Sequence, residues 1–317
     1  MSFTFEDTDL EEIGQRLDEP DAAVRRIAVL QLAETAEVGA IPLLTKALAD
    51  SDADVRMEAA RAFDEFEGPA IVEALMDALG DANEAVREAA AESLSEIKDP
   101  ALAPMVLARL PGPDAFSRAA LLRALRELRA PEALEPAMEA LADTDARVRR
   151  QAVGVLGYLK ADQALFGLMN AARTDAGPEV RRAAVGALVF SASDKINETL
   201  IQGLADENWR VREEAAAALG KNGLADAVGA LMQAMGDEYW QVRTKAAVSL
   251  GKLRDPRAVP VLGEALSFQV SNLRKEAAAA LGEIGDPAAL PFLEVALKDS
   301  DPDVRKLAHW AIDRIAA

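Results

Sequence analysis

Apolar and polar positions recur along this chain with a helical spacing and a fixed long period. In the stretch DENWRVREEAAAALG at 206–220, the apolar residues Val211, Ala215 and Leu219 are four apart, which places them on one face of a helix. The same pattern returns as DEYWQVRTKAAVSLG at 237–251. The recurrence predicts a series of similar amphipathic helices, one in each copy of a repeat.

A two-residue pair, in most copies an apolar residue followed by arginine, marks each copy of the repeat. The pairs are Val24-Arg25, Val55-Arg56, Val86-Arg87, Ser117-Arg118, Val148-Arg149, Val180-Arg181, Val211-Arg212, Val242-Arg243, Leu273-Arg274 and Val304-Arg305. Eight of the nine intervals between them are 31 residues long, and the interval that ends at Val180 is 32. A period of this length predicts a stacked solenoid, because each repeat buries its apolar face against its neighbours.

A second, shorter helix is expected between consecutive pair-bearing helices. It is represented by DPRAVPVLGEAL at 255–266 and DPAALPFLEVAL at 286–297, in which Asp can cap the helix and Pro can occupy its first position. Gly220, Gly251 and Gly282 follow the periodic residues, so we interpret them as signals that end the pair-bearing helix. Each repeat is therefore expected to form a helical hairpin.

These motifs resemble HEAT repeats, and in particular the short, regular repeats of the phycobilisome-lyase group. The shared pattern is DPxAVPxLxxAL, then Asp, then VRxxAAxALG, and it extends over essentially all 317 residues. The resemblance implies an all-α fold, a right-handed α-solenoid of about ten hairpins that forms a single domain over residues 1–317. Irregularities are expected near 111–118, 173–180 and 267–273.

The repeated arginine invites a phosphate-binding interpretation, but its surroundings favour a structural role. An acidic residue stands six positions before it in eight repeats, namely Glu19, Asp50, Asp81, Asp143, Asp175, Asp206, Asp237 and Asp299. Carboxylate and guanidinium groups at a fixed spacing can form a ladder along the stack, and the resemblance to HEAT repeats implies such a ladder. Gly112 and Phe268 replace the acid in the other two repeats. The ladder is expected to break there, either at a bend or binding loop or through neutral drift.

Composition narrows the function further. The net charge of −19 disfavours general affinity for nucleic acid or anionic membranes, although the acidity could also reflect a salty cytoplasm. The chain has no cysteine and a single histidine, His309, which we expect to join Trp310 in a C-terminal cap. The sequence shows no phosphate-binding glycine loop or metal-ligand cluster. We therefore expect no enzyme activity, catalytic residue, cofactor or metal.

The N-terminal segment MSFTFEDTDLEE lacks the basic and apolar regions of a signal peptide. No stretch is long and apolar enough to span a bilayer. We expect a cytoplasmic protein.

The exposed side of the pair-bearing helices is the expected partner-binding surface. In stacks of this kind the second helix of each hairpin usually lines the concave face, and the side opposite the core falls at offsets +2, +6 and +10 from the pair. In the early repeats the residue at offset +10 is glutamate. The middle is basic and aromatic, and its candidate residues are Arg123, Arg150, Gly154, Tyr158, Arg182, Gly186 and Phe190. The glycines could leave a gap for a partner side chain or a flat ligand, with the aromatics as anchors. Alternatively, the aromatics fill space near the 32-residue interval.

A secondary group of candidates consists of aromatic residues in the hairpin loops. These are Trp209, Tyr239, Trp240 and Phe268. Trp209 and Trp240 share one offset, so packing between repeats is their expected role.

The function we favour is a non-catalytic scaffold or adaptor that binds a protein partner on its concave face. The oligomeric state stays open. The resemblance also allows an accessory subunit of the bilin-lyase kind, acting on a chromophore protein. A HEAT-like DNA glycosylase is a further alternative that the net charge disfavours.

Overall fold

The computed structural model describes residues 10–112, 114–191, 194–223 and 225–316. The chain divides into two compact units, Met1–Leu159 and Lys160–Ala317. In the described part the regular structure is entirely helical, with twenty α-helices and nine short 3-10 helices. The expected all-α solenoid of ten hairpins is confirmed. Its continuity as a single domain over 1–317 stays a prediction.

Unit 1 contains five hairpins. Their helices are α1 (Leu10–Arg16), α2 (Ala22–Thr35), η1 (Val38–Ala40), α3 (Ile41–Ala47), α4 (Ala53–Ala62), η2 (Phe63–Glu65), α5 (Pro69–Ala78), α6 (Glu84–Glu96), η3 (Pro100–Leu102), α7 (Ala103–Arg109), α8 (Ala115–Glu127), η4 (Pro131–Ala133), α9 (Leu134–Ala140) and α10 (Ala146–Leu159).

Unit 2 contains the other five. Their helices are η5 (Asp162–Ala164), α11 (Leu165–Thr174), α12 (Pro178–Leu188), η6 (Asp194–Ile196), α13 (Asn197–Gly203), α14 (Trp209–Asn222), η7 (Ala225–Ala227), α15 (Val228–Ala234), α16 (Trp240–Leu253), η8 (Pro256–Ala258), α17 (Val259–Ala265), α18 (Ser271–Ile284), η9 (Pro287–Ala289), α19 (Leu290–Ala296) and α20 (Pro302–Ala316).

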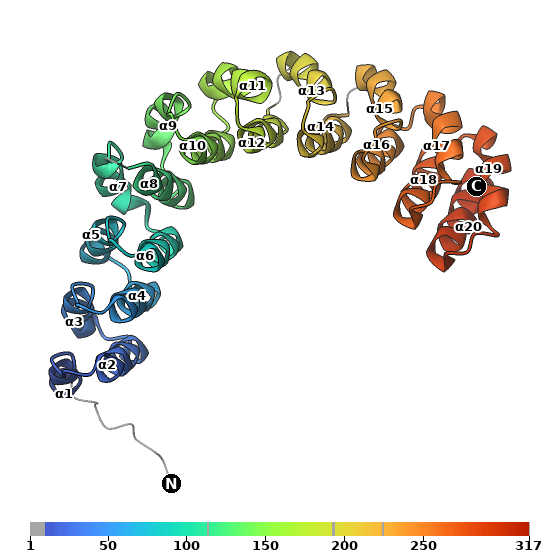
Figure 1. The fold of residues 1–317 in the computed structure, drawn as a ribbon. Helices are drawn as coiled ribbons and strands as arrows, with labels where there is room; N and C mark the ends of the chain where they lie inside the picture. Colours follow the sequence, from blue (N-terminus) through green and yellow to red (C-terminus); the bar gives the residue numbers. More distant parts are fainter. Residues whose placement is uncertain (1–9, 113, 192–193, 224, 317) are drawn as a thin grey trace, which may run out of the picture. The chain divides into compact units, whose positions relative to one another are not determined.

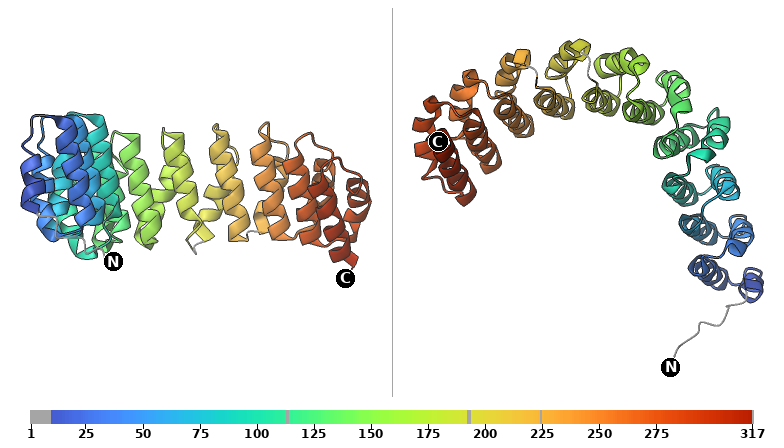
Figure 2. Two further views of the ribbon diagram at one scale, coloured as in Figure 1. Left: turned by 90° about the horizontal axis from the view of Figure 1, so that it is seen from below. Right: turned by 180° about the vertical axis from the view of Figure 1, so that it is seen from behind.

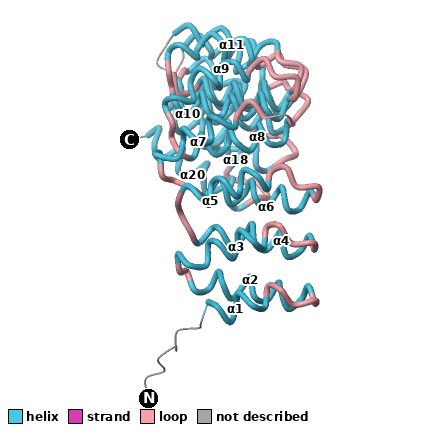
Figure 3. The backbone as a smooth tube through the Cα atoms, turned by 90° about the vertical axis from the view of Figure 1, so that its left-hand side faces the viewer, coloured by secondary structure: helices cyan, strands magenta, loops and turns pink. Residues whose placement is uncertain are grey.

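Within each unit the helices form two layers (Figure 1). The odd-numbered helices make one layer, and the even-numbered helices, which carry the pairs, make the other. In the left view of Figure 2, successive hairpins of unit 2 stand side by side. In unit 1 the loops gather at the two ends of the helices (Figure 3). Within each unit the pair-bearing helices lie on the inner side of the bend, as expected for the second helix of each hairpin.

The core follows the predicted offsets. Val211, Ala215 and Leu219 of α14 are all fully buried, and their counterparts in α16 are buried in the same way. Alanine at +4 and +5 gives the helix a flat side, so consecutive pair-bearing helices approach closely. This contact fixes the register in which successive hairpins stack.

The interpretation of Gly220, Gly251 and Gly282 as helix-ending signals is wrong. All three lie inside helices that continue for two further residues, and the left-handed residues that end α14 and α16 are Gly223 and Arg254. A Cβ atom on Gly220 would lie 2.3 Å from Ser249 Oγ in α16, and one on Gly251 would lie 2.8 Å from a backbone Cα atom of α18. These glycines therefore permit close packing between neighbouring helices.

The three expected irregularities have different outcomes. The interval of 32 residues is accommodated by α11, which spans ten residues where α17 spans seven. Near 111–118, Asp114 caps α8 and accepts a hydrogen bond of 2.6 Å from Ser117 Oγ; residue 113 lies outside the described residues. Near 267–273 the connection has the regular length, because five residues separate α17 from α18 and five separate α15 from α16.

Candidate functional site

The repeated arginines form the predicted ladder, as Arg212 illustrates. Its Nε and Nη2 atoms donate to the Asp237 carboxylate of the next hairpin over 2.6 and 3.0 Å. Its Nη1 atom donates to the Asp206 carbonyl oxygen in its own hairpin loop over 2.8 Å. The same two-pronged carboxylate contact joins Arg25 to Asp50, Arg56 to Asp81, Arg118 to Asp143, Arg181 to Asp206 and Arg274 to Asp299. Each guanidinium therefore ties two successive loops together.

The ladder aspartates are held as carboxylates by these contacts. Hydrogen bonds from Arg25 hold the pKa of Asp50 below its ordinary value, although burial opposes the shift. Asp81 and Asp143 have lowered pKa values for the same reason. The Asp50 carboxylate also accepts the amide N–H of Asp52 over 2.8 Å, so it shapes its own loop. The structural interpretation of these arginines is confirmed.

The ladder breaks at the two expected places, and an aromatic ring stands in for the carboxylate. The Arg243 guanidinium lies 4.6 Å from the centre of the Phe268 ring, and that of Arg87 lies 5.3 Å from the Phe116 ring. Within the described ranges neither arginine forms an ion pair with a carboxylate, and Arg87 Nε is buried without a hydrogen-bond partner. A cation–π contact is weaker than a two-pronged ion pair at a half-buried position. These repeats therefore have weaker edge contacts than the others.

In unit 1, four of the candidate binding residues lie on α8 and α10. Arg150 is exposed and Tyr158 is 43% exposed, whereas Arg123 is half-buried. The Arg126 side chain of α8 passes over Gly154, and its Nη1 atom would be 3.3 Å from a Cβ atom there. The gap left by this glycine is therefore filled by the chain itself, contrary to the expectation that it is open to a partner.

In unit 2, the other three candidates lie on α12 and the turn that follows it. Phe190 is 59% exposed, and Lys160 Nζ lies 4.9 Å from the centre of its ring. Glu214 of α14 covers Gly186, with Oε1 3.3 Å from the position of a Cβ atom. Arg182 Nη1 is 3.5 Å from Glu179 Oε2, and its Nε is 3.9 Å from Glu214 Oε2. Here too the gap is occupied.

Tyr158 and Phe190 are thus exposed residues, so they do not act as core filler. Tyr158 lies within α10, whereas Phe190, at the same offset, lies in the turn after α12. Because the two sets lie in different units, their meeting in one patch stays a prediction.

The secondary aromatic group packs between repeats, as expected for Trp209. The Trp209 and Tyr239 rings stack with their centres 5.3 Å apart and their planes 12° apart. The Arg210 guanidinium lies 5.2 Å from the Trp209 ring, and that of Arg212 lies 5.6 Å from the Tyr239 ring. Trp240 is the first residue of α16 and is partly exposed. The aromatics therefore form a column with arginines at the edge of unit 2.

A polar pocket on the inner layer of unit 2 was not predicted. It has a volume of about 340 Å³ and is lined by Arg182, Arg210, Glu213, Glu214, Ala217 and Lys245. Arg182, Glu213 and Ala217 fall at the offsets +2 and +6, whereas Arg210, Glu214 and Lys245 fall outside the predicted stripe. The sequence feature that could have indicated this pocket is the charge of α16, which carries three basic residues and no acidic one.

Sequence and structure comparisons agree with this geometry. The family model for HEAT repeats matches residues 10–70, 60–120, 103–189, 165–250, 197–268 and 268–316. The chain belongs to the HEAT-repeat family. No curated protein matches its sequence.

Solved structures with the same fold include an engineered protein, which is 22% identical and has a TM-score of 0.53 over 98% of this chain and 99% of that chain. The Escherichia coli protein YibA is 22% identical, with a TM-score of 0.58 over 94% and 99%. Yeast importin-β (Kap95p) is 16% identical, with a TM-score of 0.64 over 96% of this chain and 50% of its own. It also matches in its complex with Nup1. This HEAT-repeat chain spans about half the length of importin-β.

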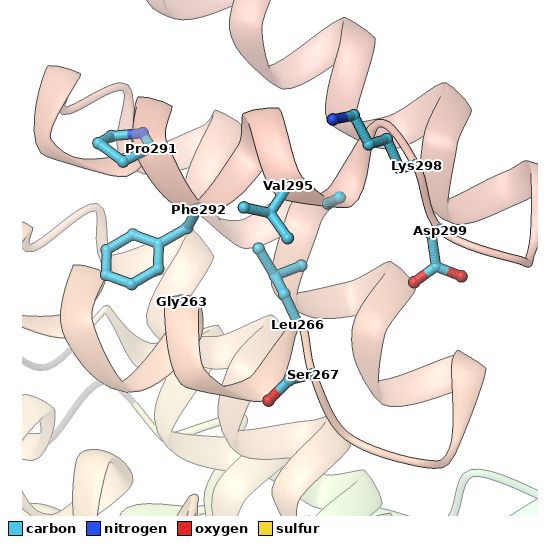
Figure 4. A pocket seen from close by; sticks show the side chains of 9 residues that line it. Gly263, Leu266, Ser267, Pro291, Phe292, Val295, Lys298 and Asp299 are labelled. Carbon is cyan, nitrogen blue, oxygen red and sulfur yellow. The ribbon is translucent and has the colours of Figure 1, made fainter.

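The outer layer of the HEAT-repeat unit 2 carries an apolar pocket between α17 and α19, with a volume of about 650 Å³ (Figure 4). The Phe292 ring lies directly over Gly263, and Val295 and Leu266 point into the same space. Val295 is 74% exposed. The sequence feature that could have indicated this pocket is Val295, because the equivalent position in the preceding repeat is the charged residue Glu264.

The one histidine of this HEAT-repeat chain lies in its last helix. His309 is exposed on α20, beside Trp310, whose ring packs against Gly282 and carries the Arg314 guanidinium at 5.3 Å. Among the residues that the structure describes, no three His, Asp or Glu side chains cluster as a metal site. In the same ranges, no helix is long and apolar enough to cross a membrane.

Proposed function

We propose that this HEAT-repeat chain is a non-catalytic scaffold or adaptor that binds a protein partner through the exposed faces of its pair-bearing helices. The observation that carries the proposal is that Arg150 and Tyr158 of unit 1, and Arg182 and Phe190 of unit 2, are all exposed on that layer. Aromatic and arginine side chains supply much of the binding energy in protein interfaces. The ladder arginines are already occupied, so they leave this role to the arginines on the face.

The charge distribution of unit 1 supports recognition of a partner in one orientation. The exposed residues Glu84, Glu88, Glu92 and Glu96 line α6, whereas α10 carries three arginines and no acidic residue. A partner whose basic groups face α6 and whose acidic groups face α10 would be attracted, and the same partner in the reversed orientation would be repelled. The importin-β comparison supports a protein partner by analogy of fold, since that protein forms a complex with Nup1. A cytoplasmic location is part of the proposal.

Photo-crosslinking tests the proposal. A photoreactive phenylalanine analogue replaces Tyr158, Phe190 or, as a control, Phe166, which is 81% exposed on α11 in the opposite layer. After illumination in cells of the source organism, we expect Tyr158 and Phe190 to yield the same crosslinked protein and Phe166 to yield none. Crosslinks that form equally from Phe166, or only from Phe166, would refute binding through the pair-bearing layer.

A further inference from the structure

The polar pocket of unit 2 has an unusual charge for this chain. Three cationic side chains line it, from Arg182 of α12, Arg210 of α14 and Lys245 of α16, together with the carboxylates of Glu213 and Glu214. The lining is therefore net positive in a chain whose net charge is −19. The volume of about 340 Å³ is at the lower end of the range of about 300–1,000 Å³ found for ligand sites. It suits one or two side chains of a partner.

Arg210 is held in place but not neutralised. Its guanidinium rests 5.2 Å from the Trp209 ring, and Trp209 is itself fixed by stacking on Tyr239. Throughout the described ranges, the Arg210 side chain has no ion pair and donates no hydrogen bond, unlike Arg212 two residues later. A guanidinium carries five N–H donors in a rigid fork that matches a carboxylate. Little side-chain entropy would be lost when such a ligand binds.

The other two cations are also incompletely paired. The contacts of Arg182 with Glu179 and Glu214, at 3.5 and 3.9 Å, exceed the length of about 2.7–2.9 Å that is typical of charge-assisted hydrogen bonds. Lys245 is exposed on a helix without acidic residues, and no carboxylate of the described residues lies within ion-pair distance of it. Both side chains can approach an added carboxylate more closely than they approach the glutamates of the chain.

We propose that this pocket binds carboxylate side chains in an acidic segment of the partner protein, an inference that rests on the proposed scaffold function. Arg210 would receive the carboxylate in its fork, and Lys245 and Arg182 would approach it from the neighbouring helices. A nucleic acid is disfavoured, because its continuous phosphate backbone would extend beyond this small, net positive pocket onto the surface of a chain whose net charge is −19.

Fluorescence anisotropy with a labelled oligoglutamate peptide tests this proposal on the full chain. The Arg210→Gln/Lys245→Gln double variant should bind the peptide about tenfold more weakly than the unaltered protein, since two charge-assisted contacts are lost. Lys252→Gln is the matched control, because it removes one charge from the same helix outside the pocket. It should change the affinity by less than about twofold. Binding should weaken as salt is raised.

Several outcomes would overturn the proposal. These are equal binding by the double variant and the control, absence of peptide binding by the unaltered protein, and tighter binding of oligothymidylate than of oligoglutamate. Circular dichroism checks folding, and the single Lys245→Gln variant replaces the double variant if that one unfolds. Crosslinking from Tyr158 and Phe190 that persists in the double variant, without peptide binding to the pocket, would reject the pocket and leave the scaffold function standing.

Discussion

Arg210 and Arg212 lie two residues apart on α14, yet they belong to different surfaces of unit 2. Arg212 points to the loop edge, where Asp237 and the Asp206 carbonyl group occupy its donors. Arg210 lies at the pocket on the inner layer, where its guanidinium rests 5.2 Å from the Trp209 ring and forms no ion pair among the described residues. The difference shows that the partners of an arginine, and not its abundance in the sequence, decide whether it stabilises the stack or is available for recognition.

The largest expected effect separates these two arginines by stability. Arg212→Ala should lower the free energy of unfolding by about 3 kcal/mol, because it leaves the half-buried Asp237 carboxylate without its ion-pair partner. Arg210→Ala should leave the urea midpoint nearly unchanged, since surface substitutions have small effects. Equal losses of the midpoint in the two variants would contradict the division between edge and face.

A smaller effect concerns pH. Burial alone would raise the pKa of Asp237, but hydrogen bonds from Arg212 and from the Tyr239 amide outweigh burial and hold the pKa below its ordinary value. The ion pair therefore stabilises the fold above the unfolded-state pKa of about 3.9, and this contribution is lost as the pH falls through the lower folded-state pKa. Asp237→Asn should cost about 1–2 kcal/mol at neutral pH.

Thermal midpoints measured from neutral to acidic pH check this prediction. The difference between the unaltered protein and Asp237→Asn should shrink in acid. A difference that stays constant at all pH values would show that the carboxylate charge contributes nothing at this rung of the ladder.

The smallest expected effect repairs a break in the ladder. Gly112→Asp restores the acid missing opposite Arg87, and a Cβ atom at this position meets no atom closer than 3.4 Å. We expect stabilisation by about 1 kcal/mol, partly from the new ion pair and partly from reduced freedom of the unfolded chain. Gly112→Ala supplies only the second contribution. Thermal unfolding of the two variants should therefore rank Asp above Ala, and the reverse order would show that Arg87 gains nothing from a carboxylate.

Much of the fold could be predicted because its determinants recur at fixed spacing. The offsets of Val211, Ala215 and Leu219 identified the core, and the acid six residues before the arginine in eight repeats identified the ladder. The role of Gly220 could not be found in this way, because a glycine that ends a helix and one that admits a neighbouring helix look alike in one repeat.

The candidate site was less predictable, since it depends on side chains that cross between helices. Arg126 and Glu214 fill the gaps at Gly154 and Gly186, although each comes from a different repeat than the glycine it covers. The polar pocket likewise combines residues from three helices, and Arg210, Glu214 and Lys245 lie at offsets outside the predicted stripe. Periodicity within one helix does not specify such contacts.

The central claim is tested most directly by measuring two quantities on Arg210→Gln and Arg212→Gln. One is the urea midpoint, and the other is the affinity for the labelled oligoglutamate peptide under conditions in which both variants are folded. We predict that Arg212→Gln lowers the midpoint and keeps nearly the full affinity, whereas Arg210→Gln keeps the midpoint and weakens binding. If both variants changed the same quantity to the same extent, the separation of a stabilising edge from a recognition face would be contradicted.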